Sequence, residues 1–420
     1  MRPAILAAAT TLLLAACVGG DAALGAARAR DGSPSAVYDA VCELVARHFY
    51  DPELRGLDWA ALRREHSAAA AACRDTGELS AVLGPMLAAL DTSHTRFVTA
   101  RDAAFYDLAG IFGLGPEYPE LFDDGVVSYD GLGLLGRAVP GGYLVQGVLH
   151  GGPAARAGLL TGDLILSADG RPFGEVSSAA GRAGHELSLS VRRRRGEPAL
   201  RIDVVPERIE PQELLLAASV ASMELVDVDS ARVAYVRVWS YADPRVHEAL
   251  VQALTSGELR DADALVLDLR GGWGGADPAY LDFFNQAVPQ LEFVARDGTR
   301  SVFDQRWRRP VVLLVDAGTR SGKELLAHAF RRHAIGPVVG QRTAGAATGG
   351  RAFPVGRDAL LYLAVMDALV DGERLEGVGV EPDVTVPFEL PFSAGADPQR
   401  DVALRLAASE AAAARPARGH

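Results

Sequence analysis

Two short apolar runs, each followed directly by a turn that contains glycine, most constrain what this chain can fold into. Residues 264–269 read Ala-Leu-Val-Leu-Asp-Leu, and residues 311–315 read Val-Val-Leu-Leu-Val. Runs of this length without polar alternation are typical of strands buried on both faces of a parallel sheet. Because strand-like and helical patterns alternate between residues 232 and 386, this region is predicted to be an α/β layer. In such layers, sites form beyond the carboxyl ends of the strands.

The composition of the whole chain excludes several classes of protein. Its 420 residues are 49% hydrophobic and 23% charged, which is ordinary for globular domains of ~150 residues each. The net charge of −12 argues against nucleic-acid binding, which normally needs a basic face. The three cysteines cannot form a disulfide framework, and neither they nor the nine histidines show the spacing of a zinc site.

The N-terminus is interpreted as a targeting signal. The apolar run over residues 4–16 is shorter than the ~20 residues that span a bilayer and fits a signal peptide. Leu-Ala-Ala before Cys17 resembles the bacterial lipoprotein signal; the alternative is an ordinary signal peptide. We predict a lipoprotein signal over 1–17 with lipidated Cys17, and a tether over 18–34. Because Val18 is not Asp, the protein is predicted to be anchored at the outer membrane, on the periplasmic side of the cell envelope.

The remaining chain is predicted to be multidomain α+β. Apolar residues at helical spacing predict an N-terminal helical region over 35–125. Strand-like patterns predict a second region over 126–210. The α/β core follows over 211–395, and residues 396–420 are predicted to be a C-terminal helix and tail.

The second region resembles a bacterial PDZ domain. Three elements carry the resemblance, in this order: Gly131-Leu132-Gly133-Leu134, Pro153-Ala-Ala-Arg-Ala-Gly158, and Gly162-Asp-Leu-Ile-Leu166. PDZ domains add a peptide strand to a sheet edge and hold its terminal carboxylate with backbone N–H groups. The resemblance therefore implies that the first element binds peptide. The alternative is that the domain is only a spacer.

A serine at a strand–turn–helix junction is the candidate nucleophile. The apolar run over 311–315 leads through a short turn to Ser321, and a helical pattern begins near Leu325. A serine in this place is exposed at the top of a sheet, beside helix N–H groups that favour developing negative charge. Ser321-x-x-Glu324 is equally a capping box, and this segment alone does not decide between the two.

The glycine-rich turn after the first apolar run is the candidate oxyanion hole. Its sequence over 270–275, Arg-Gly-Gly-Trp-Gly-Gly, offers backbone N–H groups without obstructing side chains. Gly271 or Gly272 is expected to complete the hole together with the Gly322 amide. The turn is not a dinucleotide fingerprint, because G-x-G-x-x-G is absent.

Three further segments complete a resemblance to a known family: residues 90–97 with Ser93-His94, residues 340–345, and residues 375–384. Together with the PDZ-like insert and the two turns, they resemble the tail-specific, C-terminal-processing serine proteases and their tricorn relatives. The match runs from about residue 36 to 410. The resemblance implies a serine peptidase core of the ClpP/crotonase-like α/β type, with no metal or organic cofactor.

The resemblance also bears on the catalytic base. Ser–Lys members of the family carry Gly-Lys after Gly-x-x-Thr-x-Gly, whereas this chain has Ala346 in place of that lysine. The tricorn-like branch implies Ser321 as nucleophile, His94 as general base and Glu376 as its partner, with Ser93 as a bridge. Imidazole can accept the serine proton, and a carboxylate can fix its tautomer. Alternatively Glu376 contacts Ser93 or water, and by spacing alone His94 and Glu376 are ordinary loop residues.

Lys323, two residues past the candidate serine, is the only lysine; every other one of the 42 Lys and Arg residues is arginine. Residues two apart on a helix do not face one another. A lysine in the first helical turn is also not expected to be desolvated enough to act as a base. Lys323 is therefore predicted to lie near the helix start or the substrate entrance, with a Ser–Lys dyad as the alternative.

The sequence as a whole predicts a cell-envelope serine endopeptidase. Its PDZ domain would capture C-terminal or unfolded segments, and its core would hydrolyse peptide bonds through an acyl-enzyme. Expected partners are polypeptides with accessible C-termini and the membrane, with no nucleic acid; whether the chain forms a homo-oligomer stays open. The alternative is a non-catalytic peptide- or ligand-binding scaffold on the same fold, which the missing Gly-Lys lysine favours.

Overall fold

The computed structural model describes residues 32–414, except for 114, 116, 288 and 305. Cys17, the predicted signal peptide and most of the tether lie outside these residues, so the lipid anchor stays a prediction. Over the described ranges, no helix is long and apolar enough to cross a bilayer, and no cluster of His, Cys, Asp and Glu is arranged to hold a metal ion. The chain divides into two compact units, each with hydrophobic core of its own.

Among the described residues, the first unit contains 32–109, 113, 115, 117–125 and 350–366. Its helices confirm the predicted helical region, and its strands pair in the order β1-β17-β16, with β1 antiparallel to β17. The elements are α3 (Pro34–His48), η1 (Leu54–Gly56), α4 (Trp59–Ala72), α5 (Thr76–Ala88), β1 (Arg96–Thr99), most of α6 (Ala103–Phe112), η2 (Pro119–Leu121), β16 (Gly349–Pro354) and β17 (Ala359–Met366).

Residues 350–366 belong to the first unit, whereas the sequence predicted that they are part of the core over 211–395. The apolar side chains of β17 explain the difference. Leu361 and Leu363 pack in one cluster with Val41 of α3 and Leu83 of α5. An alternating or apolar pattern predicts a strand, but it does not show which hydrophobic core that strand joins.

The second unit begins with a small β domain. Five strands form an antiparallel sheet in the order β3-β4-β5-β6-β7, so β3 is an edge strand, and β2 pairs with β8. The predicted strands near 143–149 and 187–195 are confirmed. The elements are β2 (Tyr129–Gly131), β3 (Leu134–Val139), β4 (Gly142–Val148), α7 (Pro153–Arg156), β5 (Leu164–Ala168), β6 (Leu187–Arg192), β7 (Leu200–Val204) and β8 (Glu207–Ile209).

The rest of the second unit is the predicted α/β layer. Its main sheet contains β9 (Glu224–Val228), β10 (Ala231–Arg237), β11 (Ala264–Asp268), β14 (Val311–Val315), β15 (Val338–Gly340) and β20 (Val384–Thr385). Two hairpins are separate: β12 (Leu291–Val294) with β13 (Arg300–Phe303), and β18 (Leu369–Val370) with β19 (Glu373–Arg374). The helices are α8 (Pro211–Ala221), α9 (Pro244–Thr255), η3 (Pro278–Phe284), α10 (Gly322–Arg332) and α11 (Pro398–Ala414).

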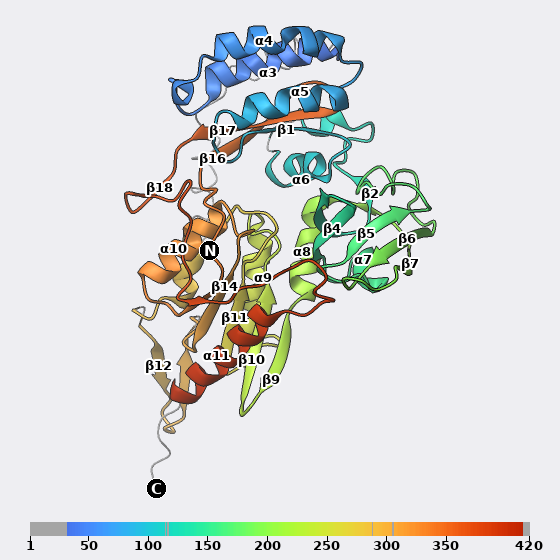
Figure 1. The fold of residues 1–420 in the computed structure, drawn as a ribbon. Coiled ribbons are helices and arrows are strands. Elements are labelled where there is room, and N and C mark those ends of the chain that lie inside the picture. The colour runs from blue at the N-terminus through green and yellow to red at the C-terminus, as the bar shows by residue number, and fades with distance from the viewer. Residues whose placement is uncertain (1–31, 114, 116, 288, 305, 415–420) are drawn as a thin grey trace. The chain divides into compact units, whose positions relative to one another are not determined.

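The main sheet is parallel at its centre, as the two apolar runs predicted. Its order is β20-β15-β14-β11-β10-β9, and every neighbouring pair is parallel except β10 with β9. All residues of β11 and β14 are buried. Helices α9 and α10 pack on one face of the sheet and α11 on the other (Figure 1). The turns after β11 and β14 therefore emerge at one edge of the sheet.

A buried ionic network ties α11 to the end of β11. The guanidinium of Arg270, 4% exposed, donates to Asp268 and Asp397 at 2.7 Å each, and to Oε1 of Gln399 at 3.1 Å. Burial alone would raise the pKa of Asp268, but Arg270 and Arg237 overcome this effect and hold it well below its usual range. The carboxylate therefore stays ionised inside the core.

Candidate active site

Ser321 lies in the turn between β14 and α10, with a half-buried side chain. Its backbone is left-handed, with φ 56° and ψ −136°, and such a conformation costs a non-glycine residue ~1–3 kcal/mol. Ser321 occupies the N-cap position of α10, but its side chain makes no capping hydrogen bond, so its hydroxyl is not used as predicted for a capping box. A strained serine between a buried strand and a helix is the geometry of a nucleophile turn.

Backbone contacts on both sides hold the turn that carries Ser321. The Ser321 N–H donates to the carbonyl of Ala346 at 2.8 Å, and the Ala344 N–H donates to the carbonyl of Thr319 at 3.0 Å. The hydroxyl of the fully buried Thr319 donates to the carbonyl of Leu269 at 3.1 Å. The nucleophile turn is therefore bound to both the loop after β15 and the end of β11.

Gly274 is the member of the glycine-rich turn that lies against Ser321. A Cβ at position 274 would lie 2.6 Å from the Ser321 Cβ and 3.1 Å from its Oγ, so only glycine fits there. Gly322, the first residue of α10, is equally tight, because a Cβ there would lie 2.4 Å from the backbone nitrogen of Ala276. These contacts make the amides of Gly274 and Gly322 the candidate oxyanion donors.

The two glycines that the sequence favoured as oxyanion donors, Gly271 and Gly272, make other contacts. The Gly271 N–H donates to Oδ1 of Asp316 at 3.0 Å, so it is not available to an oxyanion. Gly272 lies against the main chain of Trp239, whose carbonyl oxygen would be 2.0 Å from a Cβ at position 272. The expected oxyanion donor Gly271 is thus replaced by Gly274, which lies three residues later in the same glycine-rich turn.

Lys323 is the second residue of α10 and thus lies at the helix start, which is one of the two predicted positions, but its side chain is fully buried and does not face an entrance. Its Nζ donates to three carbonyls: that of Val238 at 2.5 Å, that of Gly271 at 3.0 Å and that of Trp239 at 3.3 Å. An ammonium has three N–H donors, and here each faces a main-chain oxygen. This geometry argues against a Ser–Lys dyad with Ser321.

The pKa of Lys323 is also not the ordinary one that its position in the sequence predicts. Burial, with a smaller contribution from Arg237, lowers the pKa of Lys323 to about 7, while Asp268 and Asp316 act in the opposite direction. The lysine is therefore able to lose its proton near neutral pH.

Glu324 is a buried carboxylate that holds the loop after β15. It accepts hydrogen bonds from the Thr343 hydroxyl at 2.5 Å and from the N–H groups of Gly345 and Ala346 at 2.7 Å each. Burial raises the pKa of Glu324, and these hydrogen bonds oppose the rise. Sequence reasoning assigned Glu324 only to a capping box. The Gly-x-x-Thr-x-Gly pattern was the available signal, since its threonine and glycine are the residues that Glu324 binds.

Glu376 lies in the loop between β19 and β20, with a half-buried side chain. Its Oε2 accepts hydrogen bonds from the N–H groups of Ala347 at 2.7 Å and Thr348 at 3.2 Å. It is therefore not a freely solvated loop carboxylate. The segment it binds continues directly from Ala346, whose carbonyl accepts the Ser321 N–H. The second unit thus brings Glu376 to the loop that borders Ser321, while its partnership with His94 stays a prediction.

The first unit holds Ser93 and His94 in the turn between α5 and β1. His94 has a left-handed backbone, φ 57°, and is 4% exposed. Ser93 Oγ lies 2.7 Å from His94 Nδ1, and the ring of Tyr362 lies 5.3 Å from the imidazole, centroid to centroid. The partner at one ring nitrogen sets which tautomer the imidazole adopts. This arrangement is the one expected of Ser93 as a bridge; the role of His94 as base stays a prediction.

The candidate peptide-binding loop of the β domain runs from Gly131, at the end of β2, to Leu134, at the start of β3. Leu132 and Leu134 are core residues, and Gly133 has a positive φ of 68°. The carbonyls of Leu132 and Gly133 accept hydrogen bonds from inside the domain, at 2.8 and 3.0 Å. The buried leucine side chains cannot contact a ligand, so recognition here would depend on main-chain N–H groups. Peptide binding by this loop stays a prediction.

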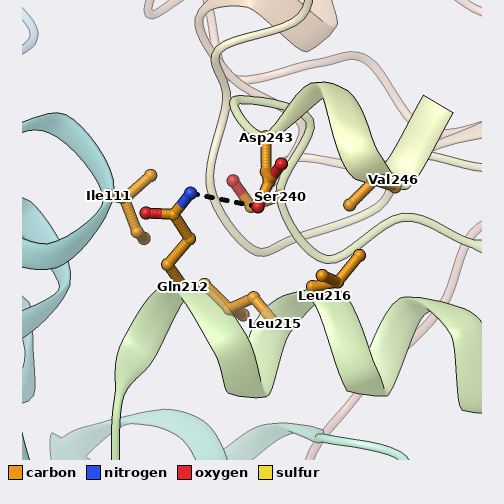
Figure 2. Close-up of a pocket in the computed structure, with 7 residues that line it drawn as sticks. All are labelled: Ile111, Gln212, Leu215, Leu216, Ser240, Asp243 and Val246. Atoms are coloured by element: carbon orange, nitrogen blue, oxygen red, sulfur yellow. Dashed lines mark hydrogen bonds between the residues drawn. The ribbon is translucent and has the colours of Figure 1, made fainter. Parts of the chain in front are cut away.

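A small pocket lies beside the glycine-rich turn (Figure 2). It is lined by Ile111, Gln212, Leu215, Leu216, Ser240, Asp243 and Val246. Its walls are mostly apolar, and the Asp243 carboxylate accepts hydrogen bonds from Gln212 at 3.0 Å and from Arg245 at 2.9 Å. The segment that lines it borders the nucleophile region, because the Tyr241 N–H donates to the carbonyl of Gly274 at 3.1 Å. The pocket has room for about one water molecule.

Three known domains match consecutive parts of this chain. Residues 33–88 match the tricorn protease C1 domain, residues 144–193 match a PDZ domain, and residues 232–386 match peptidase family S41. The protein is therefore one with an S41 peptidase domain, a PDZ domain inserted before it and a tricorn-type N-terminal domain. The family resemblance and the fold class indicated by the sequence are confirmed.

Two relatives are each matched over only part of their own length. The putative tricorn protease homolog 2 of Streptomyces coelicolor is 27% identical over 391 residues, which are 88% of this chain and 32% of the relative. The carboxy-terminal processing protease CtpB of Bacillus subtilis is 25% identical over 283 residues, 64% of this chain and 57% of the relative. The chain thus spans less than two thirds of either relative.

Solved structures confirm the fold. The photosystem II D1 C-terminal processing protease matches with a TM-score of 0.51 and 20% identity, covering 87% of this chain and 98% of that protein. The tricorn protease matches with a TM-score of 0.51 and 16% identity, covering 90% of this chain and 37% of that protein.

Proposed function

We propose that this chain is a serine endopeptidase that cleaves polypeptides through an acyl-enzyme on Ser321. The observation that carries the proposal is the setting of Ser321, a strained, half-buried residue after a buried parallel strand, uncommitted to capping and packed against Gly274. Its Oγ would attack the peptide carbonyl and release the amine, and water would then hydrolyse the ester. The N–H groups of Gly274 and Gly322 would meet the negative charge on the carbonyl oxygen, at the N-terminus of α10.

His94 is the general base of this proposal. Its Nε2 would take the Ser321 proton and pass it to the leaving amine. Ser93, at 2.7 Å from Nδ1, would fix the tautomer, and Glu376 would stabilise the imidazolium, directly or through Ser93. Two observations support histidine over lysine as base: Ala346 replaces the family's lysine, and Lys323 Nζ is surrounded by carbonyls.

The proposed substrate is an unfolded polypeptide with an accessible C-terminus. The PDZ domain supports this choice, because its edge strand β3 pairs on one side with β4 and offers its other edge to an added peptide strand. The loop over 131–134 precedes this strand and would hold the terminal carboxylate.

We also propose the location predicted from the N-terminus, on the periplasmic side of the bacterial outer membrane through lipidated Cys17. The support is the sequence Leu-Ala-Ala-Cys17 after an apolar run. The full chain should partition into the detergent phase of a Triton X-114 extract, and C17A should remain in the aqueous phase. Equal partitioning of both proteins would contradict the anchor.

The test of the activity uses an internally quenched peptide with a free C-terminal carboxylate. We expect wild type to cleave it, S321A to have no turnover above background, and S256A to cleave it at the wild-type rate. Ser256 is a suitable control because it lies at the end of α9, with an exposed hydrogen bond to the carbonyl of Gln252. Unchanged turnover in a correctly folded S321A would disprove the assignment.

The second candidate, a non-catalytic scaffold, is favoured by the absence of the family's lysine at Ala346. The same peptide distinguishes the two functions when its binding is measured by fluorescence anisotropy. Binding without cleavage by wild type would support the scaffold. Binding with cleavage that S321A loses would support the peptidase.

A further inference from the structure

We propose that Lys323 is a positioning residue that holds the oxyanion turn against the nucleophile helix; this inference rests on the proposed peptidase function. Lys323 belongs to the first turn of α10, which directly follows Ser321. Its ammonium reaches across to the ends of two strands: Val238 and Trp239 follow β10, and Gly271 follows β11. One side chain thus joins three separate stretches of backbone around the candidate site.

The chemistry of this contact requires lysine. The three carbonyls lie 2.5, 3.0 and 3.3 Å from Nζ, which matches the three donors of a compact ammonium. A planar guanidinium is larger and presents its donors as a fork. In a chain whose other Lys and Arg positions all carry arginine, the retained lysine occupies a fully buried site where a point-like cation is surrounded by carbonyls. If the ammonium were removed, the three buried carbonyls would lose its hydrogen bonds, which is costly in a protein interior.

The two backbone hydrogen bonds of Gly271 show why the contact is a clamp. Its N–H donates to Oδ1 of Asp316 at 3.0 Å, and its carbonyl accepts from Lys323 at 3.0 Å. Asp316 follows β14 and also accepts the N–H of Gly318 at 2.9 Å. The turn after β11 is therefore held at both polar backbone groups of one residue, Gly271, by a carboxylate and an ammonium from the nucleophile segment.

The clamp continues to the candidate oxyanion donor. The Trp239 carbonyl that Lys323 contacts also accepts the N–H of Trp273 at 2.8 Å. Trp273 directly precedes Gly274, and Gly274 packs against Ser321. Displacing this turn by even a fraction of an ångström would move the Gly274 amide relative to Ser321 Oγ. Because oxyanion donors act chiefly in the transition state, such a displacement should lower kcat more than it raises KM.

Charged groups on the neighbouring strands change the pKa of the Lys323 ammonium. Arg237 of β10 lowers the pKa of Lys323, whereas Asp268 of β11 and Asp316 after β14 raise it, and burial is the largest influence. Since this pKa is lowered to about 7, the ammonium loses its proton as the pH rises through that value. A neutral amine has two N–H donors, so one of the three carbonyl contacts is then lost. The clamp should therefore weaken above pH 7.

The experiment compares wild type, S321A, K323M, H94A and Y235F on the quenched peptide between pH 6 and 9. Methionine keeps the length and apolar stem of lysine without its donors. Y235F is the matched control, since it removes one buried hydrogen bond, from Tyr235 to Asp268 at 2.6 Å, within the same sheet. We expect K323M to lose about 10²-fold in kcat with KM within about twofold of wild type, and Y235F to keep kcat within about threefold.

The pH profile separates positioning from simple stabilisation. We expect wild-type kcat, and labelling of Ser321 by a fluorophosphonate, to decline above pH 7, and we expect this alkaline decline to be absent from K323M. If K323M does not fold, as judged by its circular dichroism spectrum, the wild-type profile decides alone. A wild-type kcat that stays level from pH 7 to 9, or a K323M kcat equal to that of Y235F, would overturn the proposal.

Two other outcomes identify different errors. Full activity of H94A with loss of activity in K323M would make Lys323 the base and overturn its positioning role. Equal, background-level turnover in wild type and S321A, without fluorophosphonate labelling, would reject the peptidase function itself and the inference with it.

Discussion

Each compact unit contributes one candidate catalytic residue with a left-handed backbone conformation, and the two units hold these residues in different ways. His94 in the first unit has φ 57°, and Ser321 in the second has φ 56°. The imidazole of His94 is oriented through a side chain, the Ser93 hydroxyl. Ser321 is instead placed by main-chain contacts, from its own N–H to Ala346 and from Gly274 against its side chain.

This difference teaches what each position tolerates. A side-chain hydrogen bond contributes ~1 kcal/mol and can be removed without moving the backbone. Main-chain packing at van der Waals contact leaves no room for an added atom. We therefore expect graded effects from substitutions around His94 and nearly complete losses from substitutions around Ser321.

The largest effect is expected from G274A. A methyl group at this position would lie 2.6 Å from the Ser321 Cβ, so either the serine or the turn must move. We expect kcat to fall by about 10³-fold, more than the loss of one oxyanion donor alone. Peptide hydrolysis measures the fall, and the thermal melting curve checks the fold.

The matched control is G84A in α5 of the first unit, where a Cβ would meet nothing within 4 Å. This variant should keep wild-type activity and gain up to ~1 kcal/mol in stability, because alanine favours a helix. If G274A were as active as G84A, the tight packing around Ser321 would have no catalytic meaning.

The next largest effect is expected on stability. R270A leaves Asp268 and Asp397 without their shared guanidinium, and removing one partner of a buried ionic network costs ~3–5 kcal/mol. Urea unfolding should show this loss for the second unit. R300A breaks the exposed pair with Glu292 and should cost less than ~1 kcal/mol. Similar losses in the two variants would refute the structural importance of the network.

A smaller effect is expected from S93A in the first unit. Removing the hydroxyl beside His94 Nδ1 should reduce kcat about fivefold to tenfold, the equivalent of one hydrogen bond of ~1 kcal/mol. H94A should be far more damaging, by ~10²–10⁴-fold, because the base itself is gone. Steady-state kinetics at pH 8 separates the two. Equal losses in S93A and H94A would mean that Ser93 does more than orient the ring.

A separate effect is a pH dependence of the stability of the second unit. Burial lowers the pKa of His247 to about 4, and its ring stacks on Tyr280 at 4.2 Å and hydrogen-bonds the Tyr241 hydroxyl. The unfolded chain, with an ordinary histidine pKa near ~6.5, binds a proton before the folded chain does. Stability is therefore complete above pH 6.5 and declines as the pH falls toward 4.

H247Q should reduce this decline, because glutamine does not titrate. The urea midpoints of wild type and H247Q at pH 5 and pH 7.5 test the prediction. Parallel changes in both proteins would assign the acid sensitivity to other groups.

The sequence predicted the parallel sheet because its evidence is local: β11 and β14 are apolar runs of strand length with turns behind them. It missed the return of residues 350–366 to the first unit, since an apolar strand does not reveal which core it joins. The PDZ strands were predictable for the same reason as the sheet, because alternation and glycine spacing are local patterns.

The site was predicted less completely. Ser321 and the glycine-rich turn follow from strand ends, but the exchange of Gly271 for Gly274 depends on which N–H is already bonded to Asp316. The position of Lys323 at the helix start was predicted, but the burial of its side chain was not, because two-residue spacing describes only its relation to Ser321. Contacts between distant loops decide both cases, and sequence spacing does not record them.

The most direct test of the central claim is the chemical identity of the reactive residue. Wild type treated with a fluorophosphonate should carry the label on the tryptic peptide that contains Ser321, and S321A should carry none. A label on another residue, or no label on a protein that still cleaves the quenched peptide, would contradict Ser321 as the nucleophile.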